Sequence, residues 1–151
     1  MAYGEGADPR NATLKTGTVV YGPGKIMTMD STNNTLDLSD VTEIGLGISA
    51  GDSSRTAAKV LQTAAGATVS YYPLGGMLMV QSEAAVTYTT GLTVYVGASG
   101  LATATAGSNK KLGLYVGEGQ TTDALVDNGA GDSTATEGTM IPVATAGAEI
   151  A

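Results

Sequence analysis

The sequence predicts a small all-β protein, either a β-barrel or a β-sandwich, and two observations support this. Short segments in which apolar and polar residues alternate with period two recur along the chain, and Gly, Asn or Asp bounds most of them. Phe, Trp, Cys and His are absent, so a core must be built mainly from Val, Leu, Ile, Met and Ala. Side chains of this size fill a thin two-layer structure more readily than a deep core.

The chain of 151 residues matches the length of one domain, and its composition divides it into three parts. Residues 1–15 show no hydrophobic periodicity and are expected to form a flexible N-terminal arm. Residues 16–127 are expected to form the β domain. Residues 128–151 are expected to be a flexible loop and a C-terminal tail, with a last strand over 140–143 as an option.

Individual strands follow from the alternation of residue types. They are expected near residues 16–21, 25–29, 43–48, 68–72, 77–81, 85–89, 92–96, 101–104 and 112–116. In the segment 92–96, the alternation puts Leu92, Val94 and Val96 on one face. The segment 112–116 repeats this pattern with Leu112, Leu114 and Val116, which are therefore also expected to share a face.

The segment 52–65 has the residue spacing of a helix. Ala57, Val60, Leu61 and Ala64 recur at intervals of three and four, and Asp52 or Ser53 could cap its start. A loop rich in Ala explains the same segment equally well, so the sequence predicts at most one short helix.

Charge and hydropathy exclude several classes of function. The formal net charge is −7, and the seven Lys and Arg residues form no basic patch, which argues against nucleic-acid binding. The richest apolar stretch, residues 74–80, is interrupted by Gly75 and Gly76 and is too short to cross a membrane. Residues 1–15 contain no apolar run typical of a secretion signal, so synthesis in the cytoplasm is expected.

The residue types also argue against an enzyme. Without His or Cys there is no imidazole base and no thiolate nucleophile. Two acidic clusters remain, Asp37 with Asp40 and Asp123 with Asp127, and solvated surface acids explain both better than a catalytic pair. The segment 127–132 faintly resembles a calcium loop but lacks its ligand spacing. The sequence therefore assigns no catalytic, cofactor-binding or metal-ligating residue.

Residues suited to protein contacts are the features that remain. Tyr71 and Tyr72 lie close in sequence to Met77 and Met79, and both residue types are enriched at the centres of interfaces. Packing in the core explains the Met pair at least equally well. In the N-terminal arm, Tyr3, Arg10 and Lys15 suit an anchor, a carboxylate contact and a rim charge on a partner.

Five segments, taken in order, resemble the small capsid decoration (cement) proteins of tailed bacterial and archaeal viruses. They are residues 17–21 (GTVVY), 45–48 (GLGI), 75–80 (GGMLMV), 91–103 (GLTVYVGASGLAT) and 111–119 (KLGLYVGEG). The resemblance covers about residues 16–119 and depends mostly on Gly, Thr and Val. The chain departs from the family in its longer connection at 52–65 and in its acidic, Gly-rich tail.

The resemblance implies a homotrimer that lies on the outer surface of an icosahedral virion and binds the major capsid protein there. It brings no catalytic, cofactor or metal residues with it, and no membrane or nucleic-acid partner. Tyr3, Arg10 and Lys15 are the residues expected to contact the capsid.

Two other functions fit a small β-rich chain. One is a viral surface-fibre or receptor-binding module, although the chain contains no long repeats of the kind found in fibres. The other is a secreted carbohydrate-binding or hydrolytic domain, which the absence of Trp disfavours because such domains use exposed aromatic platforms.

Overall fold

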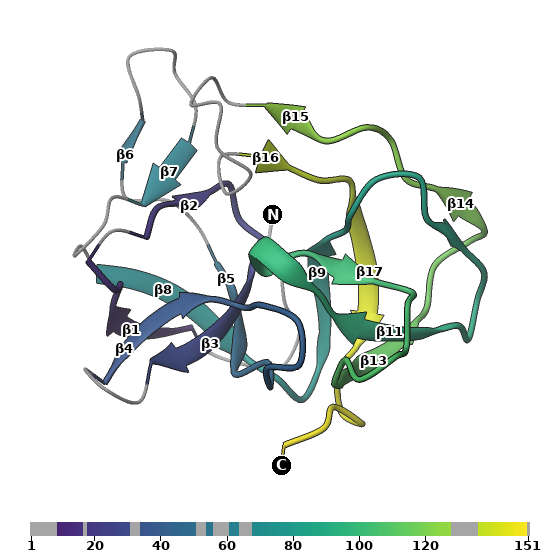
Figure 1. The fold of residues 1–151 in the computed structure, drawn as a ribbon, viewed down its shortest axis with the longest axis horizontal. Helices are drawn as coiled ribbons and strands as arrows, with labels where there is room; N and C mark the ends of the chain where they lie inside the picture. Colours follow the sequence, from purple (N-terminus) through teal and green to yellow (C-terminus); the bar gives the residue numbers. More distant parts are fainter. Residues whose placement is uncertain are drawn as a thin grey trace.

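The chain folds as a sandwich-like arrangement of two five-stranded antiparallel sheets with smaller sheets at its margins (Figure 1). This computed structural model describes residues 9–16, 18–30, 34–50, 54–55, 61–63, 68–127 and 136–150. Among these residues there is no α-helix, and one 3-10 turn covers Ala98–Gly100. The predicted all-β class is therefore confirmed, and of the two architectures left open the sandwich is the correct one.

The first sheet has the strand order β1-β8-β5-β3-β4. Its strands are β1 (Arg10–Thr13), β8 (Thr68–Pro73), β5 (Gly47–Ser49), β3 (Ile26–Asp30) and β4 (Thr35–Leu38). The sheet curls until its two edge strands meet at one end, where Leu14 bridges Leu36 and the Lys15 amide donates to the Leu36 carbonyl at 2.8 Å. The contact is confined to that end, so the sheet does not close into a barrel.

The second sheet has the strand order β12-β11-β13-β17-β9. Its strands are β12 (Ala102–Thr103), β11 (Thr93–Val96), β13 (Lys111–Tyr115), β17 (Met140–Ala144) and β9 (Met77–Gln81). The longest ladder joins β17 to β9 over five residue pairs, from Met140 opposite Gln81 to Ala144 opposite Met77. The last strand of the chain therefore lies inside this sheet, between strands that precede it by 25 residues or more.

Short strands complete the structure. One small sheet contains β2 (Val20–Tyr21), β7 (Leu61–Thr63) and β6 (Ser54–Arg55). A two-stranded ribbon pairs β10 (Thr87–Tyr88) with β14 (Gln120–Thr121). A second ribbon pairs β15 (Val126–Asp127) with β16 (Thr136–Glu137). The helix considered over 52–65 is wrong at the described residues, because Ser54 and Arg55 pair with Gln62 and Leu61 in an antiparallel hairpin. Pairing with β2 outweighs the weak helical spacing there, as tertiary contacts commonly do.

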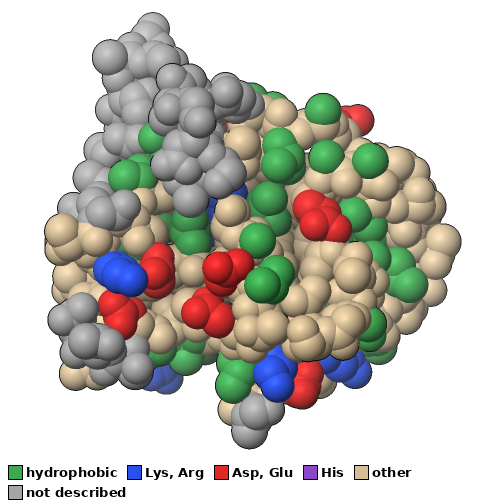
Figure 2. Space-filling view, viewed as in Figure 1, with side chains coloured by type: hydrophobic (Ala, Val, Ile, Leu, Met, Phe, Trp, Pro, Cys, Tyr) green, Lys and Arg blue, Asp and Glu red, His purple; other side chains and the backbone are tan. Residues whose placement is uncertain are grey.

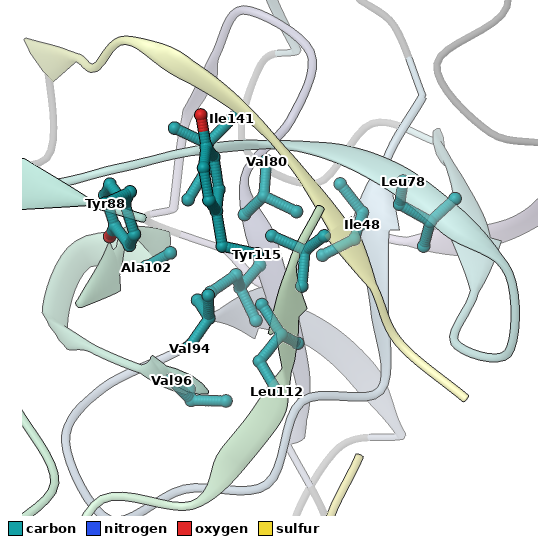
Figure 3. Packing of buried hydrophobic residues seen from close by; sticks show 12 residues of the cluster. Ile48, Leu78, Val80, Tyr88, Val94, Val96, Ala102, Leu112, Tyr115 and Ile141 are labelled. Carbon is teal, nitrogen blue, oxygen red and sulfur yellow. The ribbon is translucent and has the colours of Figure 1, made fainter. Parts of the chain in front are cut away.

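Two hydrophobic clusters stabilise the fold, and Figure 3 shows the larger one, in which side chains from both sheets point toward one another. It consists of Ile26, Ile48, Leu78, Val80, Tyr88, Val94, Val96, Ala102, Leu112, Tyr115, Ile141 and Val143. The smaller cluster lies within the curl of the first sheet and consists of Leu14, Val20, Met27, Leu36, Leu38 and Val69. All of these side chains are fully or almost fully removed from solvent.

The predicted alternation is right for β11 and wrong for β13. Val94 and Val96 are buried and Leu92 packs against the same cluster, as expected. In β13, by contrast, Leu112 is buried whereas Leu114 is 40% exposed and Val116 is 42% exposed. The ladder contains an irregularity here, since Val94 lies opposite Gly113 but Tyr95 lies opposite Lys111. Tyr115, rather than Leu114, therefore points into the core.

The segments expected to be an arm and a tail each contain a strand. Residues 10–13 form β1, which pairs with β8 from Arg10 opposite Tyr71 to Thr13 opposite Thr68. Leu14 follows and is completely buried. At the other end, the optional last strand over 140–143 is confirmed as β17 (Met140–Ala144), and its Ile141 and Val143 belong to the main core. Residues 1–8 and 128–135 of these predicted segments lie outside the described residues.

Replacing Leu14 should show whether the start of the chain contributes to stability. We expect Leu14→Ala to lower the free energy of unfolding by about 2–5 kcal/mol, because it leaves a cavity in the smaller cluster. Urea unfolding followed by circular dichroism measures the change. Thr13→Ala, an exposed position in the adjoining strand, is the matched control and should cost less than about 1 kcal/mol. Equal stability of the two variants would mean that residues 10–14 act as a detachable arm.

Candidate functional site

The outer face of the second sheet carries a patch of apolar side chains that is partly open to solvent. Residues paired directly across an antiparallel ladder place their side chains on the same face. One row across four strands is Met77, Ala144, Leu114 and Thr93; a second row across three is Met79, Pro142 and Val116. We call these seven residues the open face.

Exposure distinguishes the open face from the core face of the same strands. Met77 is 37% exposed and Leu114 and Val116 are similar, whereas Leu78, Val80, Ile141 and Val143 on the other side are completely buried. No residue of the open face is charged. A sheet face that is apolar and uncharged but open to solvent is typical of a protein contact surface.

The turn at Gly22–Gly24 covers one end of this side of the sheet, and the open face ends there. The Gln81 side-chain amide donates to the carbonyls of Tyr21 at 3.1 Å and Pro23 at 2.8 Å, and its oxygen accepts from the Gly138 amide at 3.0 Å. Gly24 in this turn has a positive φ of 97°, and a Cβ there would meet the Met140 sulfur at 2.6 Å. The turn therefore needs glycine at this position to seat against β17.

Pro142 explains why the face has an open margin beside β13. It accepts a hydrogen bond from the Val116 amide at 3.1 Å but has no N–H to return, so the β13–β17 ladder ends at the pair Tyr115–Val143. Val116 consequently lies just beyond the strand, with its side chain next to Pro142 and 42% exposed. Pro142 thus ends the pairing between β13 and β17 and leaves Val116 exposed at the edge of the open face.

The sequence located part of this surface. Met77 and Met79, considered as interface residues, do lie on the open face. Tyr71 and Tyr72 do not, because they belong to β8 of the first sheet. Consecutive strand residues point to opposite sides there, so Tyr72 packs against the main cluster and Tyr71 against the smaller one. Leu114, Val116 and Pro142 were missed, since the irregular pairing in β13 and a proline in a central strand both depart from simple alternation.

Lys15, one of the three predicted capsid contacts, is engaged within the protein. Its ammonium lies 3.2 Å from a carboxylate oxygen of Asp37 and 3.6 Å from one of Asp30, and Figure 2 shows a positive side chain beside acidic ones over β1, β3 and β4. The hydrogen bond to Asp37 is the main cause that raises the pKa of Lys15. Its charge is thus largely offset by its neighbours, although its side chain remains 42% exposed.

The other two predicted contacts are not brought into the same cluster. Arg10 is exposed at the start of β1, the edge strand of the first sheet, where it lies opposite Tyr71. Tyr3 lies outside the described residues. The three residues therefore remain predictions as capsid contacts.

Of the two acidic clusters, only Asp37 with Asp40 has both side chains among the described residues, and these two carboxylates accept hydrogen bonds from different groups. Asp37 accepts hydrogen bonds from the Lys15 ammonium, the Thr18 hydroxyl and the Leu38 amide, whereas Asp40 accepts from the Val41 amide in the next turn. Asp123 is exposed, and the side chain of Asp127 and most of the segment 127–132 lie outside the described residues. In the parts of the chain that the structure describes, no three Asp or Glu residues come together in a way that could hold a metal ion.

A buried lysine that the sequence did not single out ties several segments together. Lys25 is completely inaccessible to solvent, and its ammonium donates to the carbonyls of Thr136 at 2.6 Å and Ser99 at 3.4 Å. Burial lowers the pKa of Lys25 to about 8, while the carboxylate of Glu137 acts in the opposite direction. Lys25 thus joins the end of the Gly22–Gly24 turn to β16 and to the 3-10 turn.

A cavity of about 680 Å³ opens between β3, the loop 42–46 and the end of β8. Its apolar lining is Met29, Ile44, Leu46, Pro73, Leu74 and Ile150, with Glu43 and Lys110 among its polar residues. Its size is in the range of ligand sites, and its lining suits an apolar group.

Comparisons with known proteins leave the family open: neither the models of known protein families nor the curated protein sequences give a match to this chain. In the described part of the chain, no helix is long and apolar enough to span a membrane.

The lowered pKa of Lys25 predicts a pH dependence of stability. The unfolded chain keeps this proton up to about pH 10.5, whereas the folded chain releases it near pH 8, so the unfolded state binds more protons between these values. The free energy of unfolding should therefore rise, by about 2 kcal/mol between pH 7.5 and 9.5. Urea unfolding at the two pH values measures this rise.

Lys25→Met is the matched control, because it keeps an unbranched side chain and removes the titrating group. Its free energy of unfolding should change much less over the same pH range. The chain has no His or Cys to titrate nearby, and the α-amino group is common to both proteins. Burial raises the pKa of Tyr88, which lowers stability only above about pH 10, outside this window. Parallel pH profiles for the two proteins would refute the assignment to Lys25.

Proposed function

We propose that this chain is a structural virion protein that binds the outside of an icosahedral capsid and stabilises it. In this proposal the protein forms a homotrimer, contacts the major capsid protein, catalyses no reaction and needs no cofactor. The observation that supports the proposal is that this small all-β chain exposes two surfaces suited to contacts with protein, the uncharged, apolar open face and the β1 edge with its exposed Arg10.

A protein of this function needs two separate contact surfaces, one for the shell and one for its own copies. The described chain offers two regions on different sheets. The open face lies on the second sheet, and the edge strand β1 with Arg10 and Lys15 lies on the first. Many copies on one shell make even a weak individual contact effective, provided that the assembled protein engages several sites at once.

The order of the segments GTVVY, GLGI, GGMLMV, GLTVYV and KLGLYV provides independent support from the sequence. Four of these segments contain or adjoin strands of the two main sheets (β5, β9, β11 and β13), and GTVVY contains β2. The residues that carry the resemblance are therefore those that build the fold.

The β1 edge is our candidate for the surface that faces the shell. Arg10 is exposed there, and a guanidinium can bind a carboxylate of a partner through two hydrogen bonds. Lys15 contributes less in this proposal than the sequence alone indicated, because Asp30 and Asp37 already occupy its ammonium.

Co-sedimentation with capsid shells that lack decoration protein tests the proposal. The purified chain should pellet with shells of its own virus and saturate at a fixed ratio to the major capsid protein. Arg10→Ala should weaken this binding at least about tenfold, equivalent to about 1.4 kcal/mol per site, without a change in melting temperature. Lys110→Ala, which removes a cation elsewhere on the surface, is the matched control and should bind like the original chain.

Two results would contradict the proposal in different ways. If the chain does not pellet with shells but binds host cells, it is a receptor-binding or surface-fibre module. If the chain binds shells and Arg10→Ala binds equally well, the shell contact lies elsewhere than the β1 edge.

A further inference from the structure

We infer that the open face is the contact between copies of this chain. The inference deepens the proposed function, since it assigns one of its two contact surfaces, but it concerns the free protein and can be tested without any shell. It is drawn from the charge, the shape and the chemistry of the face itself.

Charge decides in favour of a second copy as the occupant. The chain carries a net charge of −7, so two copies repel each other wherever acidic surfaces approach. Asp30, Asp37, Asp40 and Glu43 lie in β3, in β4 or in the loop after β4, on the first sheet, and exposed Glu118 lies two residues beyond Val116. None of these acids belongs to the open face, so its seven uncharged residues offer two acidic molecules a contact with no like charges among them. A basic partner would gain more by docking on the acidic side.

The shape of the open face suits packing against another sheet. Its first row runs straight across β9, β17, β13 and β11, which at the usual strand spacing is about 14 Å. Sheets pack face to face through rows of this kind, with their side chains interdigitating. Thr93 at the end of the row, and Tyr95 next to it on β11, provide the polar margin that surrounds the apolar centre of most interfaces.

The residue types suit self-association as well. Met77 and Met79 have flexible, polarisable side chains that adapt to the surface of another copy, and the smaller residues Pro142 and Ala144 lie between them and β13. Leu114 and Val116 lie on or next to β13, on the other side of these smaller residues, and are the most exposed residues of the open face. They are therefore the side chains of the open face that a second copy would cover most.

Measuring the mass of the free protein tests the inference. Light scattering coupled to size exclusion should give a multiple of the 15.0 kDa chain mass for the original protein. Leu114→Lys and Met77→Lys, at two points of the same row, should each weaken self-association at least about tenfold and shift the mass toward that of one chain. Val41→Lys is the matched control, since Val41 is 49% exposed outside the open face, and it should leave the oligomer intact.

Circular dichroism and melting temperature show whether each variant is folded, and both Leu114 and Met77 are exposed enough to accept Lys without disturbing the core. A single-chain mass for the original protein at roughly 100 µM, where contacts of ordinary strength are occupied, would overturn the inference. It would also be overturned if both folded variants assembled as well as Val41→Lys does. Neither result bears on shell binding, which the Arg10 experiment decides separately.

Discussion

The absence of Phe and Trp is the constraint on which the interior of this protein depends. The largest side chains in the main cluster are Tyr88 and Tyr115, whose ring centroids lie 5.2 Å apart with a tilt of 31°. A buried tyrosine must satisfy its hydroxyl, and both do so locally. The Tyr88 hydroxyl is 2.7 Å from the Ser82 hydroxyl, and the Tyr115 hydroxyl donates to the Glu118 carbonyl. Small aliphatic residues from the two sheets fill the remaining space, which keeps the sandwich thin.

The fold class could be predicted from the sequence because period-two alternation and turn residues are local signals. Val94 and Val96 lie in the core as their spacing indicates. The details that failed depend on the partner strand. Nothing within residues 112–116 shows that Tyr95 pairs with Lys111, and this pairing decides that Leu114 faces solvent. Likewise, RNAT at residues 10–13 is too polar to be identified as a strand until β8 offers it a ladder.

The candidate site was less accessible from sequence than the fold. A surface patch is assembled from strands that are distant along the chain, and here β9 and β17 are separated by 58 intervening residues. Met77 and Met79 could be considered as interface residues from residue type alone. Pro142 lies in a segment that the sequence offers only as an optional last strand, and nothing local shows that this strand pairs with β9. Lys25 was missed for a similar reason: the carbonyls of Ser99 and Thr136 that hold its ammonium belong to distant parts of the chain.

The position of β17 also determines the order in which the two sheets can form during synthesis. The five strands of the first sheet lie within residues 10–73, so that sheet can pair as soon as this part has left the ribosome. The second sheet cannot be completed at that stage, because β9 and β13 are joined only through β17, which pairs with both. Until β17 pairs with them, the nascent chain exposes unpaired strand edges, and pairings so distant in sequence form slowly. A ribosome that stalls before residue 140 would therefore present half a sandwich to the chaperones of the cell.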